Sequence, residues 1–471
     1  MNNKVRYLFK NIGLLTISQF SSKFLVFILV PLYTNILTTE QYGTYDVFYT
    51  TVSLLIPILM VNITDAVLRF SLDGSTDKDK VISAGVTVYG RGLLIFGVLV
   101  AVNYFVGILP VLNLYIPYLI LMFTITAAYE ILVGYARGCD AVFDVAVAGI
   151  ISTFVTVSLN VLLLLVVKWG LDGYFCANIA GVSCAAVYLM IRMKIWRKVR
   201  FTELDKNLKR SMIVYSFPLM LTSVSWWVNS FSSRYVILGF CGVAANGIYS
   251  VAYKIPSILT AFQEVFNKAW VLSSVKTFDK EDESGFFAKT YSVYNGVMTL
   301  VCSVIIVATR LLAGLLFAKD FYAAWQYVPF LTISVVFGAM SGYLGGIFAA
   351  VKDTKAYALS TIIGAALNLA ISLVLVQFIG PMGAAVASVV SYVVVWAIRI
   401  QLVKKHIKLK LSWGRDCIAY VLLVAQTLLL LFMPDGLLTY VALSAVLLII
   451  ASLFFTELKS VLTSFLRKGR D

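Results

Sequence analysis

Apolar stretches of about 20 residues recur along this chain from near residue 11 to near residue 456. A helix of that length spans the hydrocarbon core of a bilayer, which is about 30 Å thick. The stretches follow one another without a gap long enough for a separate soluble domain, and hydrophobic residues make up 61% of the chain. Soluble domains are closer to half apolar. The sequence therefore predicts an all-α membrane protein that crosses the bilayer many times.

Gly, Pro, Asn and clustered charges separate the apolar stretches and divide them into fourteen expected helices. Their ranges are 11–36, 42–68, 81–109, 115–136, 141–167, 172–194, 211–240, 246–275, 286–317, 323–350, 356–379, 382–403, 415–433 and 437–456. The first follows three basic residues, as a signal peptide would, but it is too long and contains Lys23. We therefore expect it to be retained as the first span.

The positive charges predict the orientation of these helices. Short loops rich in Lys and Arg stay in the cytoplasm. Threading fourteen spans places both termini on one side, and most of the 38 Lys and Arg residues fall on that side. Both termini are therefore expected in the cytoplasm. The net charge of +15 is spread over all the cytoplasmic loops, which argues against a nucleic-acid-binding surface.

Two pairs of similar segments predict an internal duplication. Ser-Ser-Lys-Phe at 21–24 matches Ser-Ser-Arg-Tyr at 232–235, and Leu-Asn followed by Gly-x-x-Gly occurs at 159–173 and again at 367–383. Both pairs have an offset of about 210 residues, which indicates a six-helix unit repeated in parallel. The expected parts are residues 1–200 with helices 1–6, residues 201–410 with helices 7–12, and residues 411–471 with helices 13 and 14 and a cytoplasmic tail.

Two further patterns have ordinary structural explanations. Gly338, Gly342 and Gly346 are spaced by four residues, which predicts a close approach of two helices. The six cysteines contain no C-x-x-C pair and mostly lie in apolar stretches, so they are expected to act as small buried side chains.

Charged residues inside the expected helices are the sharpest functional markers, because a charge near the bilayer centre costs about 2.5–3.5 kcal/mol on insertion scales. Lys23 and Arg234 occupy equivalent positions of the two repeats, and Lys254 lies in the eighth helix. These cations either face a water-filled cavity or pair with Asp65 or Glu264. The polar and aromatic residues expected to line the same cavity are Gln19, Tyr45, Tyr49, Asn229, Tyr249 and Tyr253.

The acidic residues of these helices also have alternative roles. Asp46, Asp65 and Glu264 are candidate sites for a coupling proton or sodium ion, and Asp65 and Glu264 are alternatively counter-ions of the cations. Arg91 and Glu130 lie at similar depth on consecutive antiparallel helices and are expected to form a structural ion pair. We expect no catalytic residue, metal site or cofactor, because no H-E-x-x-H, G-x-x-x-x-G-K-[ST] or G-x-S-x-G motif occurs. The single histidine, His406, lies in a basic loop.

Several stretches resemble the polysaccharide and oligosaccharide-lipid flippases of the MOP (multidrug, oligosaccharidyl-lipid, polysaccharide) exporter superfamily. They are Pro31 to Tyr33, Tyr42 to Tyr45, Asp65 to Phe70, and Asn368 to Ala385. The resemblance covers essentially the whole chain. It implies two six-helix bundles in a V that open alternately to the two sides of a bacterial cytoplasmic membrane. Helices 1, 2, 7 and 8 would line the cavity between them.

The resemblance also implies a cargo and partners. The cargo is an undecaprenyl-pyrophosphate-linked oligosaccharide, moved to the outer leaflet for synthesis of O-antigen, capsule or exopolysaccharide. Lys23, Arg234 and Lys254 would then hold this polyprenyl pyrophosphate. The tyrosines of the second helix either stack on sugar rings or belong to the interfacial aromatic belt. Further expected partners are membrane lipids, H⁺ or Na⁺ as the coupling ion, and the polymerase or assembly proteins of polysaccharide export.

Three other functions remain as alternatives. The first is another exporter of this superfamily, either a lipid II flippase or a drug or metabolite antiporter, although cavity cations disfavour a cationic drug. The second is a membrane-embedded glycan polymerase or ligase, which the short outer loops disfavour. The third is a scaffold for a glycan-assembly complex.

Overall fold

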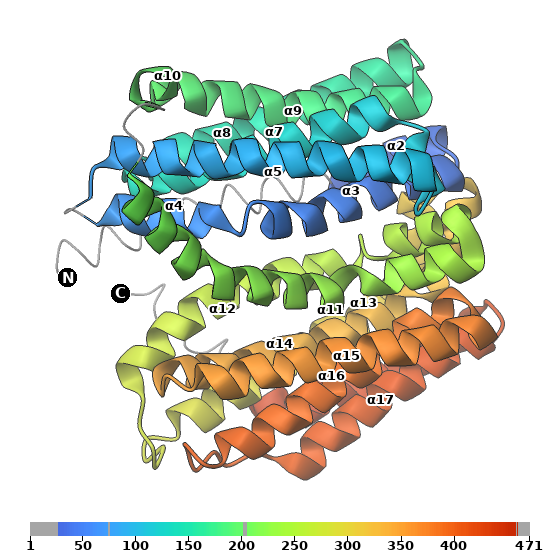
Figure 1. The fold of residues 1–471 in the computed structure, drawn as a ribbon. Helices are drawn as coiled ribbons and strands as arrows, with labels where there is room; N and C mark the ends of the chain where they lie inside the picture. The colour runs from blue at the N-terminus through green and yellow to red at the C-terminus, as the bar shows by residue number, and fades with distance from the viewer. Residues whose placement is uncertain (1–26, 74–75, 201–204, 458, 460–471) are drawn as a thin grey trace, which may run out of the picture. The chain divides into compact units, whose positions relative to one another are not determined.

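The computed structural model describes residues 27–73, 76–200, 205–457 and 459 (Figure 1). Every regular element in this part of the chain is a helix. The chain divides into two compact units, residues 1–231 and residues 232–471. The boundary between them falls within one long helix, α11 (Lys206–Ala252). The domain limits expected from the sequence, after residues 200 and 410, stay predictions.

The first unit contains the helices from α2 to the first part of α11. Their bounds are α2 Val30–Ile36, α3 Thr39–Leu59, α4 Ile63–Leu72, α5 Lys78–Val106, α6 Pro110–Asn113, α7 Ile116–Gly138, α8 Val142–Asn160, the π-helical η1 Val161–Val166, α9 Gly170–Arg192 and α10 Ile195–Lys198.

The second unit begins inside α11, which is two helices joined at Gly242, where φ is +86°. The other elements are α12 Pro256–Thr277, α13 Phe286–Leu316, the 3₁₀ helix η2 Lys319–Gln326, α14 Val328–Ala350, α15 Thr354–Ile379, α16 Pro381–Val403, α17 Trp413–Phe432 and α18 Leu437–Leu453. The last two helices pack against α13.

The helices have the length and composition of membrane spans. Among the described residues, ten helices are long and apolar enough to cross a bilayer, and α3 and α4 together make an eleventh. The shorter apolar α18 and the more polar α12 stand where two other spans were expected. Most of the first expected span lies outside the described residues. The chain is therefore an all-α, multi-pass membrane protein, as predicted.

The helix expected over residues 42–68 is broken near its centre. α3 and α4 meet at an angle of 54°, and between them Val61 and Asn62 have φ values of +51° and +49°. A β-branched residue rarely adopts this left-handed conformation. Pro57 lies one turn earlier, and its carbonyl accepts a hydrogen bond from the Asn62 N–H at 2.9 Å. The apolar pattern alone did not show this break.

The repeated Leu-Asn and Gly-x-x-Gly segments have the same structural role in the two units. Each lies at a tight antiparallel hairpin, α8–α9 in the first unit and α15–α16 in the second. Gly170 and Gly380 have φ values of +57° and +58°, which favour glycine. Asn160 and Asn368 are both buried in the preceding helices. The similarity of these segments therefore extends from sequence to conformation.

The glycines of α14 allow α12 to approach closely, as their spacing predicts. A Cβ atom at Gly342 would lie 2.7 Å from Asn267 Nδ2, and one at Gly346 would lie 2.5 Å from the Trp270 ring. The Trp270 indole N–H donates to the Tyr343 carbonyl at 2.8 Å. Larger residues at these two positions would separate the helices.

Candidate functional site

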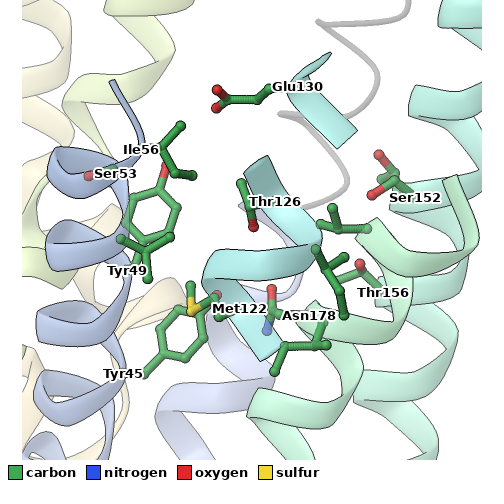
Figure 2. A pocket seen from close by; sticks show the side chains of 15 residues that line it. Tyr45, Tyr49, Ser53, Ile56, Met122, Thr126, Glu130, Ser152, Thr156 and Asn178 are labelled. Carbon is green, nitrogen blue, oxygen red and sulfur yellow. The ribbon is translucent and has the colours of Figure 1, made fainter. Parts of the chain in front are cut away.

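A pocket of about 290 Å³, with a mostly apolar lining that includes several polar groups, lies within the first unit, between α3, α7, α8 and α9 (Figure 2). Side chains four residues apart on one helix lie on the same face. The pocket takes such a set from three helices: Tyr45 and Tyr49 from α3, Met122, Thr126 and Glu130 from α7, and Ser152 and Thr156 from α8. The remaining lining residues are Val52, Ser53, Ile56, Ile125, Thr153, Asn178, Ile179 and Val182.

Several polar groups of this lining have no partner among the described residues. Within the described part of the chain, the side chains of Thr126, Glu130, Ser152 and Thr156 make no hydrogen bond or ion pair. Asn178 donates from Nδ2 to the Tyr174 carbonyl at 2.8 Å. The pocket therefore presents hydroxyl groups and one acidic residue to whatever fills it.

The wall between α8 and α9 depends on a glycine. A Cβ atom at Gly181 would lie 1.9 Å from Thr156 Oγ1 and 2.7 Å from the Ser152 carbonyl oxygen. Any side chain at this position must displace the α8 residues that line the pocket. Gly181 thus fixes both the spacing of the two helices and the shape of the pocket.

The tyrosines of α3 do not share one environment. Tyr42 is buried, and the Tyr45 ring meets the Tyr174 ring edge-on with centroids 4.5 Å apart. Asp46 is only 5% exposed and interacts electrostatically with Tyr45 and Tyr174. Tyr49 is 46% exposed and borders the pocket. These rings mostly pack inside the first unit, and Tyr45 and Tyr49 also contribute to the pocket.

The first part of α11 is attached to α3 near the pocket. The Trp227 indole N–H lies 3.0 Å from both the Thr50 carbonyl oxygen and Ser53 Oγ. Ser53 itself lines the pocket. Asn229, which we expected in the cavity, is half-buried two residues further along α11.

A second cluster surrounds Arg234 in the second unit. The Arg234 guanidinium lies over the Tyr253 ring, 5.2 Å from its centroid. The Tyr249 and Tyr253 hydroxyls are 3.3 Å apart, and the Tyr327 ring packs on Tyr249. Arg234 and Tyr249 are both buried. The bend of α11 at Gly242 allows residues from both of its parts to form one cluster. The structure thus brings together three of the residues that the sequence pointed to.

The remaining predicted residues are dispersed or undescribed. Lys23 and Gln19 lie outside the described residues. Lys254 is half-buried in the turn between α11 and α12, and Glu264 is exposed on α12. Asp65 is exposed at the start of α4 and accepts a hydrogen bond from Asn62 Nδ2 at 2.6 Å. Their assignment to substrate or coupling ion stays a prediction.

Arg91 and Glu130 form no ion pair with each other among the contacts of the described residues. Glu130 instead interacts electrostatically with the carboxylate of Asp65. Arg91 interacts electrostatically with the like charge of Lys209. Both residues are exposed in the structure. Their expected mutual neutralisation stays a prediction.

Sequence reasoning missed two sets of residues. The α8 and α9 side chains of the pocket are neutral, so a search for charges passed over them, although Ser152 and Thr156 have the four-residue spacing of a polar stripe. Arg399 lies within the expected helix 382–403 and counted there only as one of the positive charges of the cytoplasmic side, but it is buried on α16. Its guanidinium donates to the Ser341 carbonyl at 2.8 Å and to Ser360 Oγ at 2.9 Å.

The sequence profile of the polysaccharide biosynthesis protein family matches residues 8–271. This match covers more than half of the chain. The chain belongs to the polysaccharide biosynthesis protein family. The matched segment includes all of the pocket-lining residues and the Arg234, Tyr249 and Tyr253 cluster. A comparison with curated protein sequences finds no match.

Solved structures place this member of the polysaccharide biosynthesis family in a known transporter fold. The lipid II flippase MurJ in an inward closed conformation matches with a TM-score of 0.72 and 15% identity, covering 94% of this chain and 98% of its own. An inward-facing MATE family multidrug resistance transporter of the MOP superfamily gives 0.67 and 12%, covering 83% and 98%. A MOP superfamily transporter from Pyrococcus furiosus gives 0.54 and 12%, covering 84% and 95%. At these identities the likeness concerns the fold.

Proposed function

We propose that this protein is a flippase that moves an undecaprenyl-pyrophosphate-linked oligosaccharide from the cytoplasmic to the outer leaflet of a bacterial cytoplasmic membrane. The observation that carries this proposal is the family match over residues 8–271, because it links the chain to polysaccharide biosynthesis. The likeness to flippase and transporter folds over most of the chain supports transport as the activity. Transport proceeds by alternating access, with both termini in the cytoplasm.

The chemistry of Arg234 supports a pyrophosphate as the part of the cargo that is held. Guanidinium groups bind phosphate oxygens through paired N–H donors. The attraction between the two charges is stronger where water is excluded. Arg234 is buried and its planar group lies over Tyr253, which fixes the orientation of the guanidinium. A buried cation disfavours a cationic drug as cargo. Lys23 and Lys254 are proposed to assist Arg234.

A strain that lacks the gene tests the activity. We expect it to lose surface polysaccharide and to accumulate the lipid-linked oligosaccharide in the cytoplasmic leaflet. Normal surface polysaccharide without accumulation, in a strain that has no second flippase gene, would remove the proposal. Accumulation of lipid II instead would assign the chain to the lipid II branch of the same fold.

Arg234→Ala tests the cation. We expect at least about tenfold less export at an unchanged protein level, because hydrogen bonds to charged groups contribute about 1.5–3 kcal/mol each. Arg234→Lys keeps the charge and should restore part of the activity. Arg210→Ala, which changes an exposed residue of the same helix, is the control. Full activity of Arg234→Ala would exclude Arg234 from the substrate site.

Coupling to H⁺ or Na⁺ is proposed to depend on one of three acidic residues, Asp46, Asp65 or Glu264. Asp46 is favoured because it is buried within an apolar helix, where an acidic residue normally faces a partner or an ion. Asp46→Asn is expected to make transport insensitive to an imposed ion gradient, whereas Glu40→Gln, at the exposed start of α3, is expected to leave the sensitivity unchanged. If none of Asp46→Asn, Asp65→Asn and Glu264→Gln changes the gradient dependence, the proposed coupling sites are wrong.

A further inference from the structure

The pocket in the first unit is too large to be a packing defect, and its mostly apolar lining carries several polar groups. Its volume of about 290 Å³ is at the lower end of the roughly 300–1,000 Å³ range of small-molecule sites. A bare ion would fill little of this space, since one water molecule takes about 30 Å³ in the liquid. The pocket is therefore sized for a small molecule.

The lining groups are suited to a molecule that carries many hydroxyl groups. The side chains of Thr126, Glu130, Ser152 and Thr156 have no partner in the described part of the chain. Hydroxyls both donate and accept, and a carboxylate accepts two or more hydrogen bonds from one ligand. Polar groups left without partners in a pocket favour a ligand that supplies them.

The opposite wall of the pocket is aromatic. Tyr45 and Tyr49 project from α3 toward the α7 side chains Met122 and Thr126, and Asn178 faces the same space from α9 (Figure 2). An aromatic ring offers a flat apolar surface with a polar hydroxyl at its tip. The apolar C–H face of a pyranose ring fits such a surface, while its hydroxyls reach the polar wall.

The acidic residue of the lining bears on which sugars fit. Among the described residues, Glu130 carries the single carboxylate of the pocket, and no lysine, arginine or histidine lines it. Its charged neighbour is another carboxylate, Asp65. An acidic sugar would place its own carboxylate near Glu130 with no cation among the described lining residues to compensate, and like charges at close range disfavour binding. A neutral sugar or one with a basic amine avoids this repulsion.

We propose that the pocket between α3, α7, α8 and α9 is a binding site for one neutral or amino-sugar residue, with Tyr49 as the stacking surface and Glu130 as the acceptor that excludes uronic acids. This proposal rests on the proposed function, from which it takes the saccharide. It goes further by giving a location and a charge preference for sugar recognition within the first unit.

Saturation-transfer NMR on the purified full chain in detergent tests the site. The probes are glucose, N-acetylglucosamine and glucuronic acid at millimolar concentration. We expect transfer to at least one of the two neutral sugars, with binding of glucuronic acid at least about tenfold weaker. Equal binding of glucuronic acid would overturn the charge preference. Binding of sodium or protons at Glu130 without any transfer to a sugar would overturn the sugar site and make the pocket an ion site.

Paired variants locate the binding. Tyr49→Ala should remove most of the transfer, whereas Tyr104→Ala, at a tyrosine that is 60% exposed outside the pocket, should not. Glu130→Gln should weaken binding of the neutral sugar and abolish the discrimination against glucuronic acid. Glu40→Gln, which changes an exposed glutamate of α3, should leave both unchanged. The result for a variant counts only if its melting temperature equals that of the parent protein. Transfer that survives Tyr49→Ala and Glu130→Gln unchanged would place the sugar elsewhere.

The failure of this site and the failure of the proposed function give different results. One outcome is that saturation transfer shows sugar bound in the pocket while the purified protein moves no lipid-linked oligosaccharide. In that case the sugar site stands and the flippase assignment falls. If translocation is normal in Tyr49→Ala and Glu130→Gln, the flippase assignment stands and the pocket is excluded from sugar recognition.

Discussion

Gly181 has no Cβ atom, and this allows the close approach of α8 and α9 that shapes the wall of the pocket. A Cβ atom there would lie 1.9 Å from Thr156 Oγ1, so a larger residue must push α8 away. Gly181→Val is expected to destabilise the folded protein by about 1–3 kcal/mol or more, as overpacked cores do. The measurement is the melting temperature in detergent. Gly97→Val is the control, because a Cβ atom at Gly97 meets nothing within 4 Å. An equal effect of the two changes would contradict the role of Gly181.

Arg399 is a buried cation that donates to backbone and hydroxyl oxygens of two neighbouring helices. Its guanidinium bonds the Ser341 carbonyl and Ser360 Oγ, and it lies over the Tyr357 ring at 4.2 Å. Arg399→Met leaves those acceptors unsatisfied and is expected to cost about 3 kcal/mol or more. The melting temperature of the purified protein measures this cost. Arg192→Met is the control, because Arg192 is 64% exposed and its ion pair with Asp144 is at the surface. Equal losses in the two variants would contradict this account of Arg399.

At the scale of single residues, sequence predicted some positions well and others poorly. Arg234 stood out because a charge in an apolar helix is costly, and it indeed lies in a buried aromatic cluster with Tyr249 and Tyr253. Ser152 and Thr156 did not stand out, because hydroxyl groups are common in membrane helices and can bond their own backbone. Only the packing of four helices shows that these hydroxyls share one pocket.

The start of α15 depends on a charged cap outside the membrane spans. The Asp353 carboxylate accepts the Ala356 N–H at 3.0 Å and faces His406 Nε2 at 3.0 Å. The Ala356 N–H and then His406 lower the pKa of Asp353 below its ordinary value. Because the folded pKa is depressed, this cap stabilises the protein above the unfolded pKa of about 3.9 and loses its effect as the pH falls through the lower folded value.

A pH series tests this cap. We expect the melting temperature of the parent protein to fall more steeply below about pH 4 than that of Asp353→Asn. Asparagine is also a good helix cap but has no carboxylate to protonate. The two proteins should differ little at low pH and most near neutral pH. Identical pH profiles would show that Asp353 contributes no pH-dependent stability.

At the scale of helices, hydropathy predicted where the helices lie better than it predicted where a helix is interrupted. Most of the expected spans in the described part of the chain match described helices, because apolar length is what a bilayer requires. Hydropathy does not reveal the break at Val61 and Asn62, where a β-branched residue adopts a conformation that local preference opposes. It also joined residues 246–275, although Pro256 begins a new helix, α12. In both places the backbone departs from the helix that side-chain character alone favours.

At the scale of the whole molecule, the two units contain similar helical hairpins, a similarity that the sequence repeats predicted only in part. The hairpins α8–α9 and α15–α16 use glycines with the same backbone conformation and a buried asparagine at the same relative place. The units differ in their polar interiors, with a pocket described in the first and the Arg234 cluster in the second. We therefore expect sugar recognition and pyrophosphate binding to be separable by mutation.

That separation is measurable with intact cells. Tyr49→Ala should reduce export of neutral saccharides more than it reduces binding of a polyprenyl pyrophosphate that carries no sugar. Arg234→Ala should reduce both. The readouts are surface polysaccharide and retention of a labelled polyprenyl pyrophosphate on the purified variants. If the two variants have the same profile, the two functions are not divided between the units.

The central claim is that the chain by itself moves a polyprenyl-pyrophosphate-linked oligosaccharide across a bilayer. The most direct measurement uses the purified full chain in liposomes that contain such a lipid and follows exposure of the sugar to a glycosidase added outside. We expect that exposure proceeds beyond the fraction initially outside, that this requires the protein, and that it slows at least about tenfold in Arg234→Ala. Exposure no faster than in protein-free liposomes would contradict this claim, provided that the melting temperature shows the protein to be folded.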